Sequence, residues 1–263
     1  MKIAVIQLTS VLDYKVNVEK IRGFLTEAKA QGAEAAFLPE VFYSMSDGVT
    51  PTPYLVEEGP QGPNEHYNNI KKLATDFNMA LIGGSAATLK DGKVVNRAYN
   101  FDKHGNDLGH YDKINLFACD LPNKKISEAN NYTAGSDYKM VEFNNTKVGL
   151  GICFDMRFSE LALHYRMNGA KILTFPAAFT VPTGKAHWHT LLRARAIENQ
   201  CYVVAAAQWG HHNEKMQTYG HSLVVDPWGD IILDLQEGEK VGVVSLDFPK
   251  IELIRQSVLM KRE

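Results

Sequence analysis

Short apolar segments alternate with amphipathic helical segments along this chain, and no other feature restricts the possible folds as much. Residues 2–8 and 35–38 are apolar runs of the kind that form strands buried on both faces of a sheet. Between them, apolar residues recur at helical spacing over 15–31, and Gly32 follows where a C-terminal cap belongs. Repeated strand-helix-strand units are typical of α/β proteins, so we predict an α/β fold.

The alternation continues along the rest of the chain. The pattern predicts helices over 66–76, 160–167 and 186–197, and strands over 80–82, 94–101, 171–175 and 201–207. Residues 139–143 and 148–152 are expected to form a hairpin, and 222–225, 231–235 and 241–246 a meander. The polar stretch 121–135 shows neither period, so we predict a loop that is long enough to be functional.

Charge and cysteine usage exclude several classes of partner and compartment. The 28 basic and 30 acidic side chains form no long runs of either sign, so nothing favours nucleic acid or an anionic membrane as a partner. No apolar stretch approaches the ~20 residues of a membrane-spanning helix, and no export signal is visible. Cys119, Cys153 and Cys201 form no C-x-x-C pair, which argues against disulfides and structural zinc. We expect a single domain over 1–263, located in the cytoplasm.

Two reactive residues follow the ends of predicted strands, and a third, Lys113, lies inside the segment 109–117 near the edge of the predicted sheet. Cys153 ends the apolar run 148–152, and a helix-opening segment follows, where a helix dipole and free N–H groups would stabilise a thiolate. Glu40 follows the proline that closes the strand over 35–38. Ligands bind at this edge of open α/β sheets, and Lys113 completes a set of nucleophile, base and cation. Taken singly, each has an ordinary alternative: an inert buried cysteine, a capping acid and a solvated lysine.

Three segments resemble the signature motifs of a known family. Residues 38–40 (Leu-Pro-Glu), 111–113 (Tyr-Asp-Lys) and 151–158 (Gly-Ile-Cys-Phe-Asp-Met-Arg-Phe) look like those of the nitrilase superfamily of carbon-nitrogen hydrolases. The motifs occur in the same order and at similar separations, and the resemblance covers nearly the whole chain. Residues 178–200 and 219–229 are similar to the branch that includes deaminated-glutathione amidase. The resemblance implies a four-layer αββα sandwich that dimerises into an αββααββα assembly.

The resemblance also implies roles for individual residues. Glu40, Lys113 and Cys153 match the Glu-Lys-Cys triad of the family, and Glu128 matches a second acid that members often carry between the lysine and the cysteine. Phe154 stands where the family commonly has tyrosine. Because the family uses the backbone N–H of this residue to hold the oxyanion, the missing hydroxyl should matter little.

The implied function is that of a thiol amidase. It would hydrolyse the amide of a small acidic substrate to a carboxylate and ammonia through a cysteine thioester, with deaminated glutathione as the favoured substrate. Alternatives in the same superfamily are an ω-amidase acting on α-ketoglutaramate, an N-carbamoyl amino-acid hydrolase and a nitrilase. A scaffold that has kept the fold and lost catalysis is an alternative from a different class.

Further candidates concern substrate binding. We expect Arg157 to hold a substrate carboxylate in a bidentate manner, with a buried ion pair to Asp155 or Glu160 as the alternative. Three residues follow the predicted strand over 171–175 and would line the pocket, unless the last of them only belongs to a turn before a helix: Phe179, Thr180 and Thr183.

The histidines raise the question of a metal. They occur as an i,i+2 pair, an adjacent pair and a single residue: His187 and His189, His211 and His212, and His221. Positions two apart on a helix point to different sides, and adjacent histidines do not easily chelate one ion. We therefore expect no metal and no cofactor.

Overall fold

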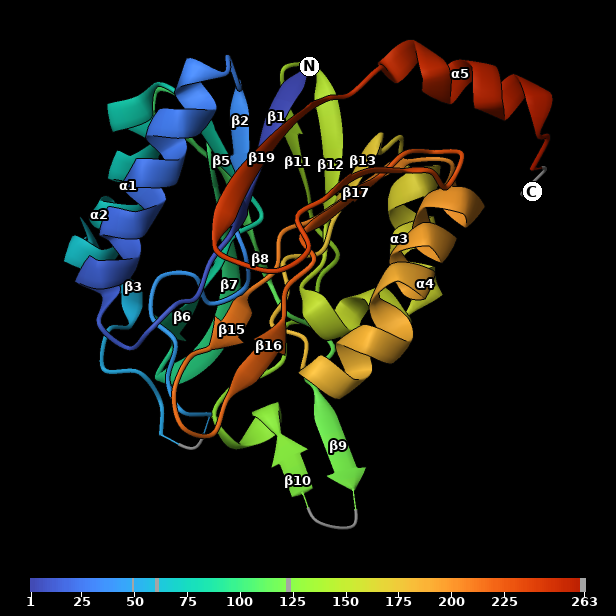
Figure 1. The fold of residues 1–263 in the computed structure, drawn as a ribbon. Helices are drawn as coiled ribbons and strands as arrows, with labels where there is room; N and C mark the ends of the chain where they lie inside the picture. The colour runs from blue at the N-terminus through green and yellow to red at the C-terminus, as the bar shows by residue number, and fades with distance from the viewer. Residues whose placement is uncertain (49, 60–61, 122–123, 261–263) are drawn as a thin grey trace.

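Two β-sheets pack face to face in the computed structural model, which describes residues 1–48, 50–59, 62–121 and 124–260. Helices cover the outer face of each sheet, so the layers run helix, sheet, sheet, helix (Figure 1). The predicted four-layer αββα sandwich is thereby confirmed. No helix within these residues is long and apolar enough to cross a membrane.

The first sheet contains the N-terminal strands. Its strands follow the order β19-β1-β2-β5-β7-β6-β3-β4, and β8 pairs with β7. These strands are β19 (Lys240–Ser245), β1 (Lys2–Gln7), β2 (Ala35–Phe37), β5 (Ala80–Ile82), β7 (Lys93–Phe101), β6 (Ser85–Lys90), β3 (Val56–Gly59), β4 (Gly62–Pro63) and β8 (Asp107–Asp112). β1, β2 and β5 are parallel, as strand-helix-strand units require.

Two helices cover this sheet, α1 (Tyr14–Ala30) and α2 (Glu65–Phe77). The Asp13 side chain caps α1 by accepting a 2.9 Å hydrogen bond from Lys15 N. Ile21, Leu25 and Ala28 form the buried face of α1, which confirms the periodicity read from the sequence. Both helices therefore bury an apolar stripe on the sheet and leave a polar face to water.

The second sheet follows the order β11-β12-β13-β14-β17-β18. These strands are β11 (Met140–Phe143), β12 (Thr146–Leu150), β13 (Ile172–Thr174), β14 (Tyr202–Ala205), β17 (Leu223–Val225) and β18 (Ile231–Asp234). α3 (Ser159–Met167) and α4 (Val181–Asn199) cover its outer face, and α5 (Phe248–Ser257) extends away near the C-terminus (Figure 1). Two hairpins lie outside both sheets: β9 (Ala118–Leu121) with β10 (Lys124–Ser127), and β15 (Trp209–His211) with β16 (Gln217–Tyr219).

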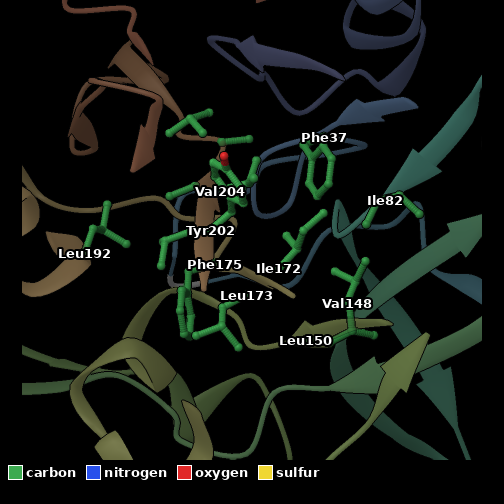
Figure 2. Packing of buried hydrophobic residues seen from close by; sticks show 14 of the residues in the cluster. Phe37, Ile82, Val148, Leu150, Ile172, Leu173, Phe175, Leu192, Tyr202 and Val204 are labelled. Carbon is green, nitrogen blue, oxygen red and sulfur yellow. The ribbon is translucent and has the colours of Figure 1, made fainter. Parts of the chain in front are cut away.

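A single apolar cluster joins the two sheets. Phe37 and Ile82 from the first sheet share it with Val148, Leu150 and Ile172 from the second (Figure 2). All five side chains are at most 2% exposed. Close packing of this layer fixes the relative position of the two sheets, and with it the position of every loop that leaves the same sheet edge.

Three local predictions are wrong. The strand predicted over 241–246 does not continue a meander; as β19 it pairs antiparallel with β1, whose edge it fills. The stretch 121–135 is not all loop, because the hairpin β9–β10 and a 3₁₀ helix (Glu128–Asn130) occupy much of its described part. Helix α4 begins at Val181 rather than at 186. The first turn accommodates Pro182 because the N–H that proline lacks would have no intrahelical acceptor there.

Candidate active site

Three strands end at one edge of the molecule and place the three candidate groups there. Glu40 lies three residues beyond β2, Lys113 directly follows β8, and Cys153 lies three residues beyond β12. All three side chains are buried, with exposures of 3%, 0% and 7%. The sequence predicted a common sheet edge, and the fold brings these residues from two different sheets to one point between them.

The carboxylate of Glu40 is held by three donors. Its Oε1 accepts hydrogen bonds from Asn96 Nδ2 at 2.9 Å and from Lys113 Nζ at 2.8 Å, and its Oε2 accepts one from Ala178 N at 2.9 Å. The segment before it packs closely on Gly84, where an added Cβ would lie 2.5 Å from Leu38 Cβ. Glu40 therefore has a fixed orientation, and its carboxylate also hydrogen-bonds the side chain of Cys153.

Lys113 joins two carboxylates. Its Nζ lies 2.8 Å from Glu40 Oε1 and 2.8 Å from Glu128 Oε2. The backbone is fixed as well, because Lys113 N donates to Asn96 O at 2.9 Å and Gly135 N donates to Lys113 O at 2.8 Å. A buried ammonium between two carboxylates stays charged, and it neutralises one of them.

Glu128 reaches this pair from the 3₁₀ helix that follows β10. Its Oε2 also accepts a 2.7 Å hydrogen bond from Phe117 N, and its own N–H donates to Phe117 O at 2.9 Å. The resemblance had matched Glu128 to a second acid, and the structure places it beside the ammonium of Lys113. Its side chain is 22% exposed, so it is the most solvent-accessible of the three charged groups.

Cys153 occupies a sharp turn between a strand and a helix. Its φ is +50°, a left-handed conformation that is uncommon for non-glycine residues. Cys153 N donates to Pro176 O at 2.8 Å, and a 3₁₀ helix spans Cys153–Arg157. Phe154 lies in the first turn of that helix, where N–H groups have no intrahelical acceptor, so its N–H is available as an oxyanion donor.

Burial and charge together set the protonation of the site. Burial raises the pKa of the Cys153 thiol well above its ordinary value, and the charge of Glu40 adds to the rise. Burial also raises the pKa of Glu40, although Lys113 opposes this. For Lys113, burial disfavours the charged form, but the carboxylates of Glu40 and Glu128 outweigh it and hold the pKa well above the ordinary value. The resting site thus holds a thiol, which needs a base to become a nucleophile.

A cavity of about 690 Å³ opens above Cys153. The sequence-predicted candidates Arg157, Phe179, Thr180 and Thr183 all line it, together with Glu40 and Glu128. Thr183 lies inside the first turn of α4 rather than in a preceding turn, and its Oγ1 lies 2.8 Å from Thr180 Oγ1. Lys113 is fully buried, and its ammonium lies against Glu40 and Glu128, which both line the cavity.

Arg157 is held by rings rather than by a carboxylate. Its guanidinium carbon lies 5.5 Å from the ring centroids of both Phe154 and Phe179, and its Nη2 lies 3.2 Å from His187 Nδ1. Its buried Nε has no hydrogen-bond partner among the described residues. The oxygens of Asp155 instead accept from Tyr111, Asn115 and the backbone of Ile152, so the alternative of an ion pair with Asp155 is not what the structure shows.

Sequence reasoning missed several residues of the site. Asn96 orients Glu40 and is 1% exposed, and Ala178 donates its N–H to the same carboxylate. Residues 44–48 and 214–218 supply much of the opposite wall of the cavity. None of these stretches carries a residue pattern that points to chemistry, and only the asparagine between two turn signals could have been suspected as a buried polar group.

Comparisons with known proteins agree on one family. The carbon-nitrogen hydrolase profile matches residues 2–256. The chain is 38% identical to mouse deaminated glutathione amidase over 261 residues, which cover 97% of this chain and 80% of the mouse protein. It is 35% identical to human omega-amidase NIT2 over 263 residues, which cover 100% and 94%. It is also 38% identical over 260 residues to the nitrilase and fragile histidine triad fusion protein NitFhit of Caenorhabditis elegans, covering 97% of this chain but only 58% of that protein.

A solved structure shows the same fold. The crystal structure of Saccharomyces cerevisiae Nit3, described as a member of branch 10 of the nitrilase superfamily, superimposes with a TM-score of 0.90 at 31% identity. The match covers 100% of this chain and 96% of that chain.

Proposed function

Because the chain belongs to the carbon-nitrogen hydrolase family, we propose that this amidase uses Cys153 as its nucleophile and deaminated glutathione as its substrate. The observation that carries the proposed mechanism is the Glu40–Lys113–Glu128 network, in which the Glu40 carboxylate also hydrogen-bonds the Cys153 thiol. A thiol, a base and a fixed cation at the floor of one cavity are what cleavage of an amide through a thioester needs.

Acylation follows from the hydrogen bonds of the site. The Glu40 carboxylate, which already hydrogen-bonds the Cys153 thiol, takes its proton as the sulfur attacks the amide carbonyl. The developing oxyanion accepts hydrogen bonds from the Phe154 N–H and from the Lys113 N–H that is left when Glu40 and Glu128 each take one. Glu40 then returns the proton to the departing nitrogen, the C–N bond breaks, and a thioester to Cys153 remains.

Deacylation uses the same groups in reverse. Glu40 removes a proton from water, the resulting hydroxide attacks the thioester, and the same two donors hold the second oxyanion. The C–S bond then breaks, and Glu40 returns a proton to the sulfur. Glu128 fixes Lys113 throughout and keeps a second negative charge beside it.

The leaving group depends on the substrate, and for deaminated glutathione it is not the ammonia expected from the sequence. Deaminated glutathione carries its amide between a 2-oxo dicarboxylic acid and a cysteinylglycine unit. Cleavage of that bond releases the amine of the dipeptide rather than ammonia. Ammonia is the product only for a primary amide such as α-ketoglutaramate.

The cavity supports the larger of these substrates. About 690 Å³ is within the range of pockets that enclose drug-sized ligands, and a five-carbon amide would leave most of it to water. Arg157 offers a bidentate partner to the carboxylate of the 2-oxo acid, since Phe154 and Phe179 hold it and no carboxylate among the described residues occupies it. The relative named deaminated glutathione amidase points to the same substrate.

An ω-amidase is the second candidate, because the relative with that name matches the chain over its whole length. Hydrolysis of deaminated glutathione and of α-ketoglutaramate both release 2-oxoglutarate, so one assay of that product compares them. We expect a higher kcat/KM for deaminated glutathione, with no ammonia formed from it. A higher kcat/KM for α-ketoglutaramate would reject the proposed substrate, and turnover of an N-carbamoyl amino acid or a nitrile in place of both would reject the acidic amide class.

The same proposal extends to location and assembly. A nucleophilic thiol is preserved in a reducing compartment, which is why we place the reaction in the cytoplasm. The homodimer rests on the family resemblance alone, and light scattering of the purified chain tests it: a monomeric mass at micromolar concentration would contradict it.

A further inference from the structure

Three side chains of metal-ligating type meet at a second place, and none of them lines the cavity. His189 lies on α4, His221 follows β16, and Asp234 ends β18. His189 Nε2 lies 3.1 Å from Asp234 Oδ2, and His221 Nδ1 lies 3.0 and 3.2 Å from the two oxygens of the same carboxylate. One ligand atom from each residue lies within 4.8 Å of the others. We propose that these three residues bind a zinc ion.

The distances and the chemistry of the ligands suit this ion. In a tetrahedral zinc site with metal-ligand bonds near 2.0–2.1 Å, neighbouring ligand atoms lie about 3.3 Å apart. The distances from the two histidine nitrogens to one shared oxygen, Asp234 Oδ2, are 3.1 and 3.2 Å and are already close to this value. Two imidazole nitrogens and one carboxylate oxygen are typical zinc ligands, and a water molecule would complete the tetrahedron.

The three side chains are held in place by their surroundings. The ring of His221 stacks on Tyr219 with centroids 4.4 Å apart, and the His221 carbonyl accepts a 2.7 Å hydrogen bond from Trp188 Nε1. Asp234 Oδ1 accepts from Gln236 N at 2.8 Å. His221 has a φ of +55°, a left-handed conformation that costs free energy in a non-glycine residue and is often kept where a side chain must point in one direction.

The site is reachable from solvent. The side chains of His189, His221 and Asp234 are 30%, 19% and 24% exposed, so an ion can enter and keep a water ligand. The carboxylate faces both imidazoles, with His189 Nε2 and His221 Nδ1 lying 3.1 and 3.2 Å from its Oδ2.

A zinc ion here would stabilise the cavity wall and take no part in the reaction proposed for Cys153. Helix α4 carries His189 of this site and also Thr183, which lines the cavity. The β15–β16 hairpin carries Tyr219, which stacks on His221, and also Thr218, which lines the cavity. The two elements already touch at Gly184, where an added Cβ would lie 2.3 Å from the Tyr219 ring. The ion would tie α4 to the chain that follows this hairpin.

This inference departs from the expectation that the chain binds no metal. Histidines that are close in sequence do not form this cluster: His189 and Asp234 are 45 positions apart, and His221 and Asp234 are 13 apart. The alternative is a hydrogen-bonded His-Asp-His network that binds no ion.

Calorimetric titration with ZnCl₂ decides between the two. The full chain is used as Cys153→Ser, because a reactive thiol is itself a zinc ligand. His189→Gln and Asp234→Asn are compared in that background, and His164→Gln on α3 is the matched control. Both test substitutions keep a hydrogen-bonding side chain of similar size, and thermal unfolding in EDTA verifies that each variant folds.

We expect one zinc ion per chain in the parent and in the His164→Gln control. Loss of either tested ligand should weaken zinc binding at least about tenfold. Removing a residue that only orients a metal ligand already has an effect of that size. Zinc should also raise the Tm of the parent and not that of His189→Gln. Failure of the parent to bind, or equal binding in all variants, would overturn the proposal, and either result leaves the amidase assignment unaffected.

Discussion

Tyr111 Oη donates a 2.8 Å hydrogen bond to Asp155 Oδ2, and this bond joins the two segments that carry Lys113 and Cys153. Asp155 is fully buried and accepts three more hydrogen bonds, from Ile152 N at 2.8 Å and from the backbone and side chain of Asn115 at 2.9 Å each. Burial raises the pKa of this carboxyl group, although its donors oppose the rise. Asp155 therefore fixes the distance between Cys153 and Lys113, the proposed nucleophile and the proposed oxyanion donor.

We expect Asp155→Asn to lower kcat by about ten- to a hundredfold while leaving KM nearly unchanged, because a carboxamide replaces one acceptor oxygen with an NH2 group that faces N–H donors. An unsatisfied buried donor costs about 1–3 kcal/mol, so the Tm should also fall. The rate of Cys153 alkylation by iodoacetamide separates positioning from simple destabilisation, since it reports on the thiol in folded protein. Tyr111→Phe removes only one of the four hydrogen bonds and should have a smaller effect; an unchanged alkylation rate in both variants would speak against the positioning role.

Cys153→Ala should abolish amide turnover, with a loss of at least about 10⁴-fold, since no other group can form the thioester. Cys119→Ser is the matched control, because Cys119 lies in the β9–β10 hairpin away from the cavity and should retain full activity. Product formation and intact-mass labelling by a thiol-reactive amide mimic are the two measurements. Preferential labelling of Cys119 or Cys201 would point to a protein that has kept the fold and lost catalysis.

Lys113→Met should lower kcat/KM by about 10²–10³-fold, since one oxyanion donor is worth roughly 3 kcal/mol. The substitution also leaves Glu40 and Glu128 buried without their cation, so the free energy of unfolding should fall. Steady-state kinetics and urea unfolding measure the two effects. A variant with normal kcat/KM would remove Lys113 from the mechanism, whatever its stability.

Glu128→Gln should move the acid limb of the kcat/KM profile to lower pH. Burial is the main cause of the raised pKa of Glu40, Lys113 opposes it, and the negative charge of Glu128 adds to the rise. Removing that charge favours the ionised form of Glu40, so its pKa falls and the base stays ionised at lower pH. The normalised pH profile checks this, and a limb displaced to higher pH would contradict the assignment of Glu40 as the base.

Arg157→Met should raise KM for 2-oxo acid amides by about 10- to 100-fold, since a hydrogen bond to a charged group is worth about 1.5–3 kcal/mol. KM for a neutral amide such as butyramide should stay unchanged, because such an amide offers no carboxylate. Arg193→Met is the control, as Arg193 donates to Gly229 O outside the cavity. Equal increases for charged and neutral amides would show that Arg157 only shapes the pocket.

Much of the fold could be predicted from the sequence because helices and strands depend on near neighbours. Apolar spacing over 15–31 corresponds to α1, and the runs 2–8 and 35–38 contain β1 and β2. The positions of Glu40 and Cys153 followed directly, since a residue just past a buried parallel strand lies at the ligand-binding edge of its sheet. The four-layer arrangement and the family came from the motif resemblance, which local periodicity alone could not supply.

Only the tertiary structure decided which distant segments meet. β19 joins β1 rather than β18 because the pairing of a strand depends on which edges and faces remain uncovered in the assembled core. The same assembly sets Glu128 against Lys113 and gathers His189 and Asp234 across 45 positions. Such contacts depend on packing across both sheets, which no short stretch of residues specifies. The sequence by itself therefore determined the elements and the reactive groups, while the fold determined their partners.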